Sequence, residues 1–408
     1  MTRERVPRRL LAMAGPLDGI RVLDFTRYQQ GPYATTMLAD LGARVVKVED
    51  PSGGDYGRRL WRGPDGYSPF WEALNRGKES ICIDLKKVEG IALVLDLAGQ
   101  FDVVAENFRT GAMERFGLGY DAFRARNERI IYAQASGWGT RGPLAESPSF
   151  DQIAQARSGF AQHAGGGPGA IPQAPYPGIA DHVGAMNFAA GILAALFARE
   201  RTGRGQRVDV SLLGSQLALQ SAELQHAFHY GEQRPREFRS SPTAGHYRCS
   251  DGRWLMIVGI DQKFWPRLCE ALEIEHLADD PRFARGGGRF ANREALQETL
   301  DSVFAKRTAA EWLERLQAVD HPAEIVQGHE DIGADPQVIA NDYVVTREHP
   351  RWGTEQTVGL HIQLSETPGA VGSPAPALGA NTRSVLRELG VDDARVESLL
   401  RDGVLSDG

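Results

Sequence analysis

The sequence predicts an α/β protein built on an open, doubly wound sheet of mostly parallel strands, and three observations carry this prediction. Five apolar, strand-like segments alternate with helical patterns between Ile20 and Gly137, which is the order typical of β-α-β units. Polar or glycine-rich segments follow these strands, where ligands bind in such sheets. The 46 glycines among 408 residues are about 11%, against a usual level near 7%, so tight turns and close backbone approaches are expected.

The elements of the first half are expected in a regular order. The segment 20–25 (IRVLDF) is largely apolar, as in a strand covered on both faces. A helix over 32–41 follows, with Pro32 near its start and Gly42 just past its end, the usual punctuation of a helix. The pattern continues with a helix over 88–98 and with strands over 44–49, 80–85, 102–106 and 130–137.

The second half predicts a smaller domain. We place a large domain at 15–225, which ends with a long apolar helix over 182–200 and a strand over 207–210. A small domain is expected at 226–330, with a hairpin that turns at Asp251 and Gly252, a dipeptide common in tight hairpin turns. Its other predicted elements are amphipathic helices over 262–273 and 308–318, and the segment 331–408 is expected to end in a helix over 381–389.

Composition excludes several classes of protein. A net charge of −7 argues against a nucleic-acid partner that is held by phosphate attraction. Three cysteines far apart in the chain provide neither a disulfide framework nor a paired-cysteine metal site, and they suit a reducing, cytoplasmic location. The apolar segment 183–198 is shorter than the roughly 20 residues that span a membrane, so we interpret it as a buried helix and expect no membrane partner.

Common cofactor and metal motifs are missing. The loop 26–32 (TRYQQGP) lacks the G-x-G-x-x-G pattern of dinucleotide binding, and the chain has no phosphate-loop or nucleophile-elbow motif. Its 10 histidines are scattered, without the spacing that a zinc site needs. We therefore expect no metal site.

Asp181 has two interpretations. It directly precedes the long apolar helix, so it can be a simple N-cap acid. In the same place, the helix-end amides and dipole would keep the carboxylate ionised, and an ionised carboxylate can attack an acyl group. The product of attack on a thioester would be a mixed anhydride, which is reactive enough to make the step reversible. The residues themselves leave both interpretations open.

Several segments follow one another in a recognisable order from about Gly15 to Gly390. They include PLDGIRVLDFTRYQQGPYATTMLADLGARVVKVEDPSGGD, LNRGKESICIDLK, VVAENFRTGAMERFGLGY, IIYAQASGWG, FDQIAQARSGF, ADHVGAMNFAAGILAALFARERTGRGQRVDVSL and APALGANTRSVLRELG. Together they resemble the family III CoA-transferases. The resemblance implies a Rossmann-like large domain made from both ends of the chain, with 331–408 returning to complete it, a small α+β domain inserted between, and an interlocked homodimer.

The resemblance also implies a site. It makes Asp181 the catalytic nucleophile, and it implies that acyl-CoA and a small carboxylic acid are the substrates, with no permanently bound cofactor. Lys86 and Arg115 would pair with the CoA phosphates, and Ile83 and Leu85 would pack beside the adenine. The full set of implied CoA contacts is Arg27, Gln29, Gln30, Ile83, Leu85, Lys86, Asn107, Phe108, Arg115, Ser136 and Gly137.

Some positions depart from the formyl-CoA transferases of this family. Gly139 follows Trp138 where those enzymes have an acidic residue, Asp50 replaces a basic residue, and the small domain has no matching run of four glycines. These differences argue against formyl-CoA or oxalate as substrates. They leave the acyl-transfer residues intact.

Two other functions stay open. The α-methylacyl-CoA racemases of the same superfamily need a base on each face of the α-carbon, and their histidine corresponds to Phe150 here, which disfavours racemisation. A non-catalytic CoA-binding paralogue is the other alternative. The expected function is transfer of CoA from an acyl-CoA to a carboxylic acid, through an aspartyl anhydride and an aspartyl-CoA thioester.

Overall fold

The computed structural model describes residues 15–175, 178–233 and 241–408, which form two compact units. The large unit holds the described residues up to Ala164 together with Gln173–Gln233 and Ile339–Gly408. The small unit holds the described residues of Gly165–Pro172 and Arg234–Val338. Its main segment therefore begins and ends eight residues later than the expected range 226–330.

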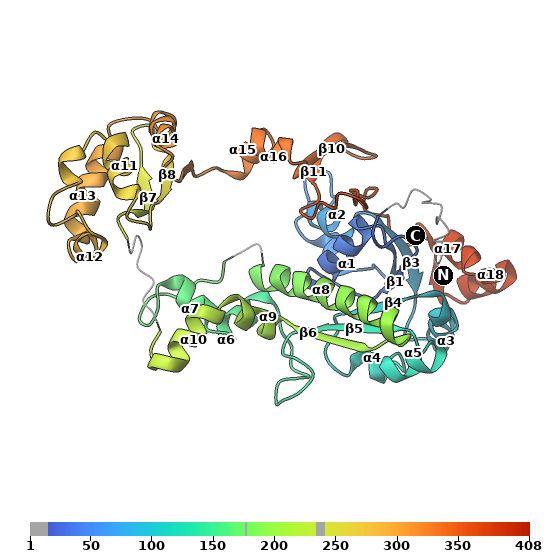
Figure 1. The fold of residues 1–408 in the computed structure, drawn as a ribbon. Coiled ribbons are helices and arrows are strands. Elements are labelled where there is room, and N and C mark those ends of the chain that lie inside the picture. The colour runs from blue at the N-terminus through green and yellow to red at the C-terminus, as the bar shows by residue number, and fades with distance from the viewer. Residues whose placement is uncertain (1–14, 176–177, 234–240) are drawn as a thin grey trace, which may run out of the picture. The chain divides into compact units, whose positions relative to one another are not determined.

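The large unit is an α/β structure around a seven-stranded sheet (Figure 1). All neighbouring strands are parallel except the last pair, in which β12 runs antiparallel to β3. The predicted α/β class and its mostly parallel sheet are confirmed. In sheet order the strands are β12 (Leu405–Ser406), β3 (Lys78–Ile83), β2 (Arg44–Glu49), β1 (Arg21–Asp24), β4 (Val103–Glu106), β5 (Ile131–Ser136) and β6 (Arg207–Ser211).

The central strands are apolar because helices cover both of their faces. Successive side chains alternate between faces, so Val22 joins one core cluster and Leu23 the other. The cluster around Val22 includes helices α1 (Gln30–Asp40) and α8 (Ile179–Thr202). The cluster around Leu23 includes α3 (Val88–Leu97), α4 (Ala112–Arg115), α5 (Tyr120–Arg126), α17 (Thr382–Glu388) and α18 (Asp393–Arg401).

Shorter elements complete the large unit. The hairpin β10 (Val344–His349) and β11 (Gly353–Val358) is antiparallel. The 3-10 helices are η1 (Tyr56–Arg59) and η2 (Ala98–Gln100). The remaining helices are α2 (Pro69–Asn75), α6 (Asp151–Arg157), α7 (Phe160–Gly165), α9 (Leu212–Leu219) and α10 (Ser221–Tyr230).

The last part of the chain lies against the edge of the large sheet. Thr382 Oγ1 accepts a hydrogen bond from the amide of Cys82 at 3.1 Å, and Asn381 Oδ1 accepts one from Ser80 at 3.0 Å. Leu405 then pairs with Ile83 across β12 and β3. The sequence after the small unit thus supplies the β10–β11 hairpin, the helices α17 and α18 and the edge strand β12 to the large unit.

The small unit packs helices on a three-stranded sheet in the order β7 (Ala244–Arg248), β8 (Trp254–Val258) and β9 (Ala323–Ile325). The predicted hairpin is confirmed, since β7 and β8 pair in antiparallel fashion around Asp251 and Gly252. The helical elements are α11 (Phe264–Ala271), η3 (Glu275–Leu277), α12 (Gly286–Ala291), α13 (Arg293–Phe304), α14 (Ala309–Ala318) and α15 (His329–Ile332), with α16 (Pro336–Ala340) at the boundary with the large unit.

The glycine run at 286–288 hid two helices from sequence analysis. Glycine is a poor helix former, yet this run forms the first turn of α12, and α13 follows one residue after it. A Cβ atom on Gly288 would lie 2.6 Å from the carbonyl oxygen of Arg282. The close approach of the two backbones therefore requires a glycine at this position.

Helix α8 is only partly buried, which corrects the prediction of a buried helix. Its 24 residues are long and apolar enough to cross a membrane by length and composition, with 44% of the most apolar window buried. Phe188 and Ile192 are fully buried in the core, whereas Met186 is 45% and Phe197 62% exposed.

Candidate functional site

A pocket of about 150 Å³ lies where the strands β1 to β4 end. The carboxyl ends of parallel strands are the usual place for a ligand in an open α/β sheet. Both charged and apolar side chains reach this pocket. It is lined by Phe25, Thr26, Arg27, Lys47, Val48, Glu49, Asp50, Gly54, Asp55, Ile83, Asp84, Leu85, Lys86, Phe108 and Phe116.

Five of the expected CoA contacts meet in this pocket: Arg27, Ile83, Leu85, Lys86 and Phe108. The Arg27 guanidinium lies 5.7 Å from the centre of the Phe108 ring, within the range of a cation-π contact. Lys86 is exposed and lies 3.1 Å from the Asp50 carboxylate. The pocket therefore offers two cations beside an apolar wall.

The pocket floor contains a buried lysine that sequence analysis missed. Lys47 is fully buried, and its Nζ lies 3.1 Å from Oδ2 of the buried Asp55. It also donates a hydrogen bond of 2.5 Å to the carbonyl oxygen of Thr26. The signal in the sequence was a lysine within the apolar strand RVVKVE, because a lysine is rarely buried unless it has partners.

A second buried lysine holds the other end of the loop 26–32. Lys78 donates hydrogen bonds to Asp24 Oδ2 at 3.1 Å and to the carbonyl oxygen of Pro32 at 2.9 Å. Burial lowers the pKa of Lys78 to about 8, against the opposing attraction of Asp24. Although burial alone would raise the pKa of Asp24, the charges of Lys78 and Lys47 hold it below its ordinary value.

Asn107 fixes the middle of the same loop. Its Oδ1 accepts a hydrogen bond from the Arg27 amide at 2.7 Å, and its Nδ2 donates to the Arg27 carbonyl oxygen at 2.8 Å. Asn107 is absent from the pocket lining. Asn107, an expected CoA contact, therefore holds the backbone of Arg27 and does not itself line the pocket.

Gln29 and Gln30 point toward the start of α8. Both are buried, and Gln29 Nε2 lies 2.8 Å from Nδ1 of His182. A Cβ atom on Gly178 would lie 2.6 Å from Gln29 Nε2, and one on Gly184 would lie 2.6 Å from Gln30 Nε2. The two glycines therefore leave room for the two amides.

Asp181 lies inside the first turn of α8, which corrects the prediction of an N-cap position. It is the third residue of the helix, and the N-cap is Gly178 with a φ of 93°. Its backbone amide donates a hydrogen bond of 2.9 Å to Asp151 Oδ1. Within the described residues, no hydrogen bond or ion pair engages the Asp181 carboxylate.

The environment of Asp181 opposes ionisation. Burial raises the pKa of this carboxyl to about 7, and the negative charge of Asp151 adds to the effect. Burial and Asp151 thus act against the helix-end amides, which were expected to keep the group ionised.

The remaining expected contacts lie outside the pocket lining. Arg115 is exposed and lies 3.9 Å from Glu146, while its neighbour Phe116 reaches the pocket. Ser136 accepts a hydrogen bond of 2.9 Å from the amide of Gly139. Gly137 packs against Ser149, because a Cβ atom there would lie 2.3 Å from the Ser149 Cβ.

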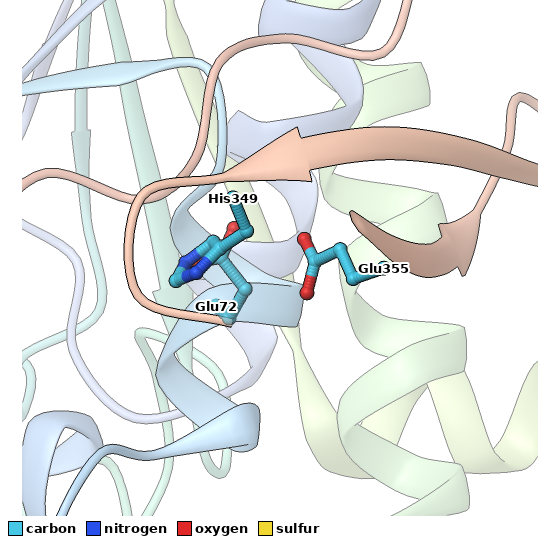
Figure 2. A group of neighbouring side chains, drawn as sticks. All are labelled: Glu72, His349 and Glu355. Atoms are coloured by element: carbon cyan, nitrogen blue, oxygen red, sulfur yellow. The ribbon is translucent and has the colours of Figure 1, made fainter. Parts of the chain in front are cut away.

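Glu72, His349 and Glu355 form a separate cluster of possible metal ligands, on helix α2 and the β10–β11 hairpin (Figure 2). Arg347 pairs with both glutamates. Tyr67 and the amide of Ala375 also donate hydrogen bonds to Glu72.

The histidine of this cluster turns its Nε2 toward Glu72 without a hydrogen bond. Its Nδ1 accepts hydrogen bonds from the amides of Arg351 and Trp352 at 3.2 and 3.1 Å. The ring proton therefore lies on Nε2, which faces Glu72 Oε2 at 3.4 Å. A metal ion needs a free nitrogen lone pair and would meet the Arg347 charge, so these contacts favour an ion-pair network.

The parallel sheet and the pocket at the carboxyl ends of its strands, lined by both charged and apolar side chains, define an α/β protein with a ligand site in the usual place for this fold. Comparison with known proteins gives the family. Residues 17–382 match the model of CoA-transferase family III, and the chain belongs to this family.

Individual relatives agree over nearly the whole chain. The acetyl-CoA:oxalate CoA-transferase of Acetobacter aceti is 36% identical, over 93% of this chain and 97% of that protein. The succinyl-CoA:glutarate CoA-transferase of Mus musculus is 32% identical, over 96% and 90% of the two chains. The crystal structure of a CAIB/BAIF family protein from Brucella suis superposes with a TM-score of 0.82 at 31% identity, over 92% and 99% of the chains. These comparisons support CoA transfer as the activity of the family.

Proposed function

We propose that this protein transfers CoA from an acyl-CoA donor to a small carboxylic acid, with Asp181 as the nucleophile. The observation that carries the proposal is the half-buried Asp181 carboxylate, which has no partner among the described residues. It lies in the first turn of α8, and the loop 26–32 connects this helix with the pocket. A partnerless carboxylate can form a covalent bond without first breaking an ion pair.

The proposed reaction runs through three covalent intermediates: a mixed anhydride with the donor acid, an aspartyl-CoA thioester and a mixed anhydride with the acceptor acid. The Asp181 carboxylate attacks the carbonyl carbon of the donor thioester. The CoA thiolate is expelled, and a mixed anhydride of Asp181 and the donor acid forms. The thiolate then attacks the aspartyl carbonyl, which expels the donor acid and leaves an aspartyl-CoA thioester. The acceptor carboxylate attacks this thioester, and the released thiolate takes the acceptor acyl group from the new anhydride, which restores Asp181.

The pocket would hold the nucleotide part of CoA. Arg27 and Lys86 present positive charge, which can pair with phosphates, and Ile83, Leu85 and Phe108 give an apolar wall. The loop 26–32 runs from the pocket toward the proposed nucleophile Asp181. Arg27 lines the pocket, and Gln29, two residues later, contacts His182 beside Asp181 in the sequence. In this proposal the loop 26–32 would lie along CoA, from its phosphates to its thioester.

Exposed apolar surface supports the proposed homodimer. Helix α10 has no buried residue in the single chain, and its Phe228 and Tyr230 are 77% and 67% exposed. Exposed apolar surface of this kind commonly marks an interface. A second copy of the chain would cover α10 and the open side of α8, in a cytoplasmic enzyme.

Substitution of Asp181 tests the proposal. Asp181→Ala and the isosteric Asp181→Asn should both lose transfer between acyl-CoA and a panel of carboxylic acids, by more than about a thousandfold as for other covalent nucleophiles, while thermal unfolding shows intact protein. Retained turnover in either variant would refute the assignment. Deuterium incorporation at the α-carbon of a branched acyl-CoA, without an acceptor acid, would instead show a racemase.

A further inference from the structure

His182 follows the proposed nucleophile in the sequence, and its ring faces the loop 26–32. The ring centre lies 4.6 Å from that of Tyr33 on α1, and its Nδ1 lies 2.8 Å from Gln29 Nε2. This is a normal hydrogen-bond length. The histidine therefore joins the nucleophile's helix directly to the loop that leads from the pocket.

The bond has a defined direction. The Gln29 nitrogen is a donor, so Nδ1 must accept and the ring proton must lie on Nε2. The carbonyl oxygen of Gly178 lies 3.3 Å from the same nitrogen. It is an acceptor, so it would bond only the opposite tautomer, and the shorter contact with Gln29 favours an accepting Nδ1. Burial lowers the pKa of His182, in keeping with this neutral form.

Gln29 has little freedom once this bond is made. The side chain is buried, and its amide lies against the backbone of Gly178, where a Cβ atom would lie 2.6 Å from Nε2. The amide is therefore enclosed between the α8 start and the loop. The two residues that the Gln29 amide contacts are close to Asp181 in the sequence: Gly178 precedes it by three residues, and His182 directly follows it.

We propose that His182 is a positioning residue, which fixes the Gln29 amide beside the place where the thioester of bound acyl-CoA meets Asp181. This inference rests on the proposed function. In this inference His182 only positions Gln29, and Asp181 remains the residue that attacks the thioester.

Four variants test the proposal: His182→Ala, His182→Asn, Gln29→Ala and the double variant of the two alanines. Loss of one hydrogen bond should lower kcat/KM for acyl-CoA about tenfold in His182→Ala. Asn carries its carbonyl oxygen in the place of Nδ1, so His182→Asn should recover activity to within about threefold. The double variant should be no slower than Gln29→Ala, because coupled residues are not additive.

Two results would overturn the role of His182. One is a His182→Asn enzyme as slow as His182→Ala at equal thermal stability, and the other is independent, multiplied losses in the double variant. Failure of the proposed function looks different, since the unaltered protein would then show neither CoA transfer nor an adduct on Asp181. Thermal unfolding of all four variants separates misfolding from mispositioning.

Discussion

At the scale of single residues, two opposing influences act on the ionisation of Asp181, the proposed nucleophile. Its carboxyl lies in the first turn of a helix, where the dipole favours the anion, yet burial and Asp151 raise its pKa to about 7. Sequence analysis located the residue and its helix start, which a local pattern shows. It could not show Asp151 on α6, which contacts Asp181 from 30 residues earlier in the sequence.

This raised pKa predicts a pH-dependent rate. Only the ionised carboxylate can attack, so kcat/KM for acyl-CoA should rise tenfold per pH unit below about 7 and level off above that pH. Initial rates across pH 5 to 9 with one donor and acceptor measure the profile. A flat profile down to pH 5 would contradict the raised pKa.

The same shift predicts an effect on stability. The folded-state pKa lies above the ordinary value of 3.8, so ionisation opposes folding: the penalty is absent below about pH 4, grows as the pH rises to about 7, and is constant above. Asp181→Asn, which mimics the neutral form, should therefore unfold at a higher temperature than the unaltered protein at pH 8. The difference should shrink toward pH 4, and an Asn variant that is less stable at pH 8 would be evidence against this account.

At the scale of elements, the sequence was most informative where burial on both faces dictates composition. The strands over 44–49 and 102–106 appear within one residue of their predicted bounds, because strands between two helical layers are mostly apolar. Helix α18 and strand β12 were missed, since neither is strongly apolar. Strand β12 depends on pairing with the distant strand β3, and α18 depends on packing in the core cluster around Leu23. The buried Lys47 and Lys78 likewise depend on partners that only the fold brings together.

The lysine pair predicts a strong stability effect at one position. Lys78→Met should lower the free energy of unfolding by about 3 kcal/mol, because it removes one partner of the buried Asp24 carboxylate. Lys86→Met, at an exposed lysine beside Asp50, serves as the control and should leave stability unchanged within error. Urea unfolding measures both, and equal stabilities of the two variants would rule out a structural role for Lys78.

The Glu72 cluster predicts the behaviour of an ion-pair network. Arg347→Met should destabilise the protein by roughly 3 kcal/mol, since it leaves two carboxylates without their shared cation. Addition of EDTA or of Zn²⁺ should leave the melting temperature of the unaltered protein unchanged. A metal-dependent rise in melting temperature that disappears in His349→Ala would show a metal site instead.

At the scale of the whole molecule, the single chain leaves apolar surface uncovered on α8 and α10. The resemblance to family III CoA-transferases implied a dimer, but composition and periodicity gave no sign of one. An interface helix has the same apolar pattern as a core helix, and the difference appears only when one face is left exposed in the folded chain.

The dimer proposal predicts a change of mass in solution. Phe228→Glu should shift the protein toward the monomer in light scattering after size exclusion, because a buried unpaired charge opposes association. Val88→Glu is the control, since Val88 is 72% exposed on α3 and should leave the dimer intact. A monomeric unaltered protein, or equal behaviour of the two variants, would contradict the proposal.

The most direct test of the central claim is mass spectrometry of the protein after incubation with an acyl-CoA alone. The account predicts a peptide that carries CoA as a thioester on Asp181, converted to a hydroxamate at the same residue by hydroxylamine and absent in Asp181→Asn. An adduct on another residue, or turnover without any adduct in rapid-quench samples, would contradict the claim that Asp181 is the nucleophile of this transferase.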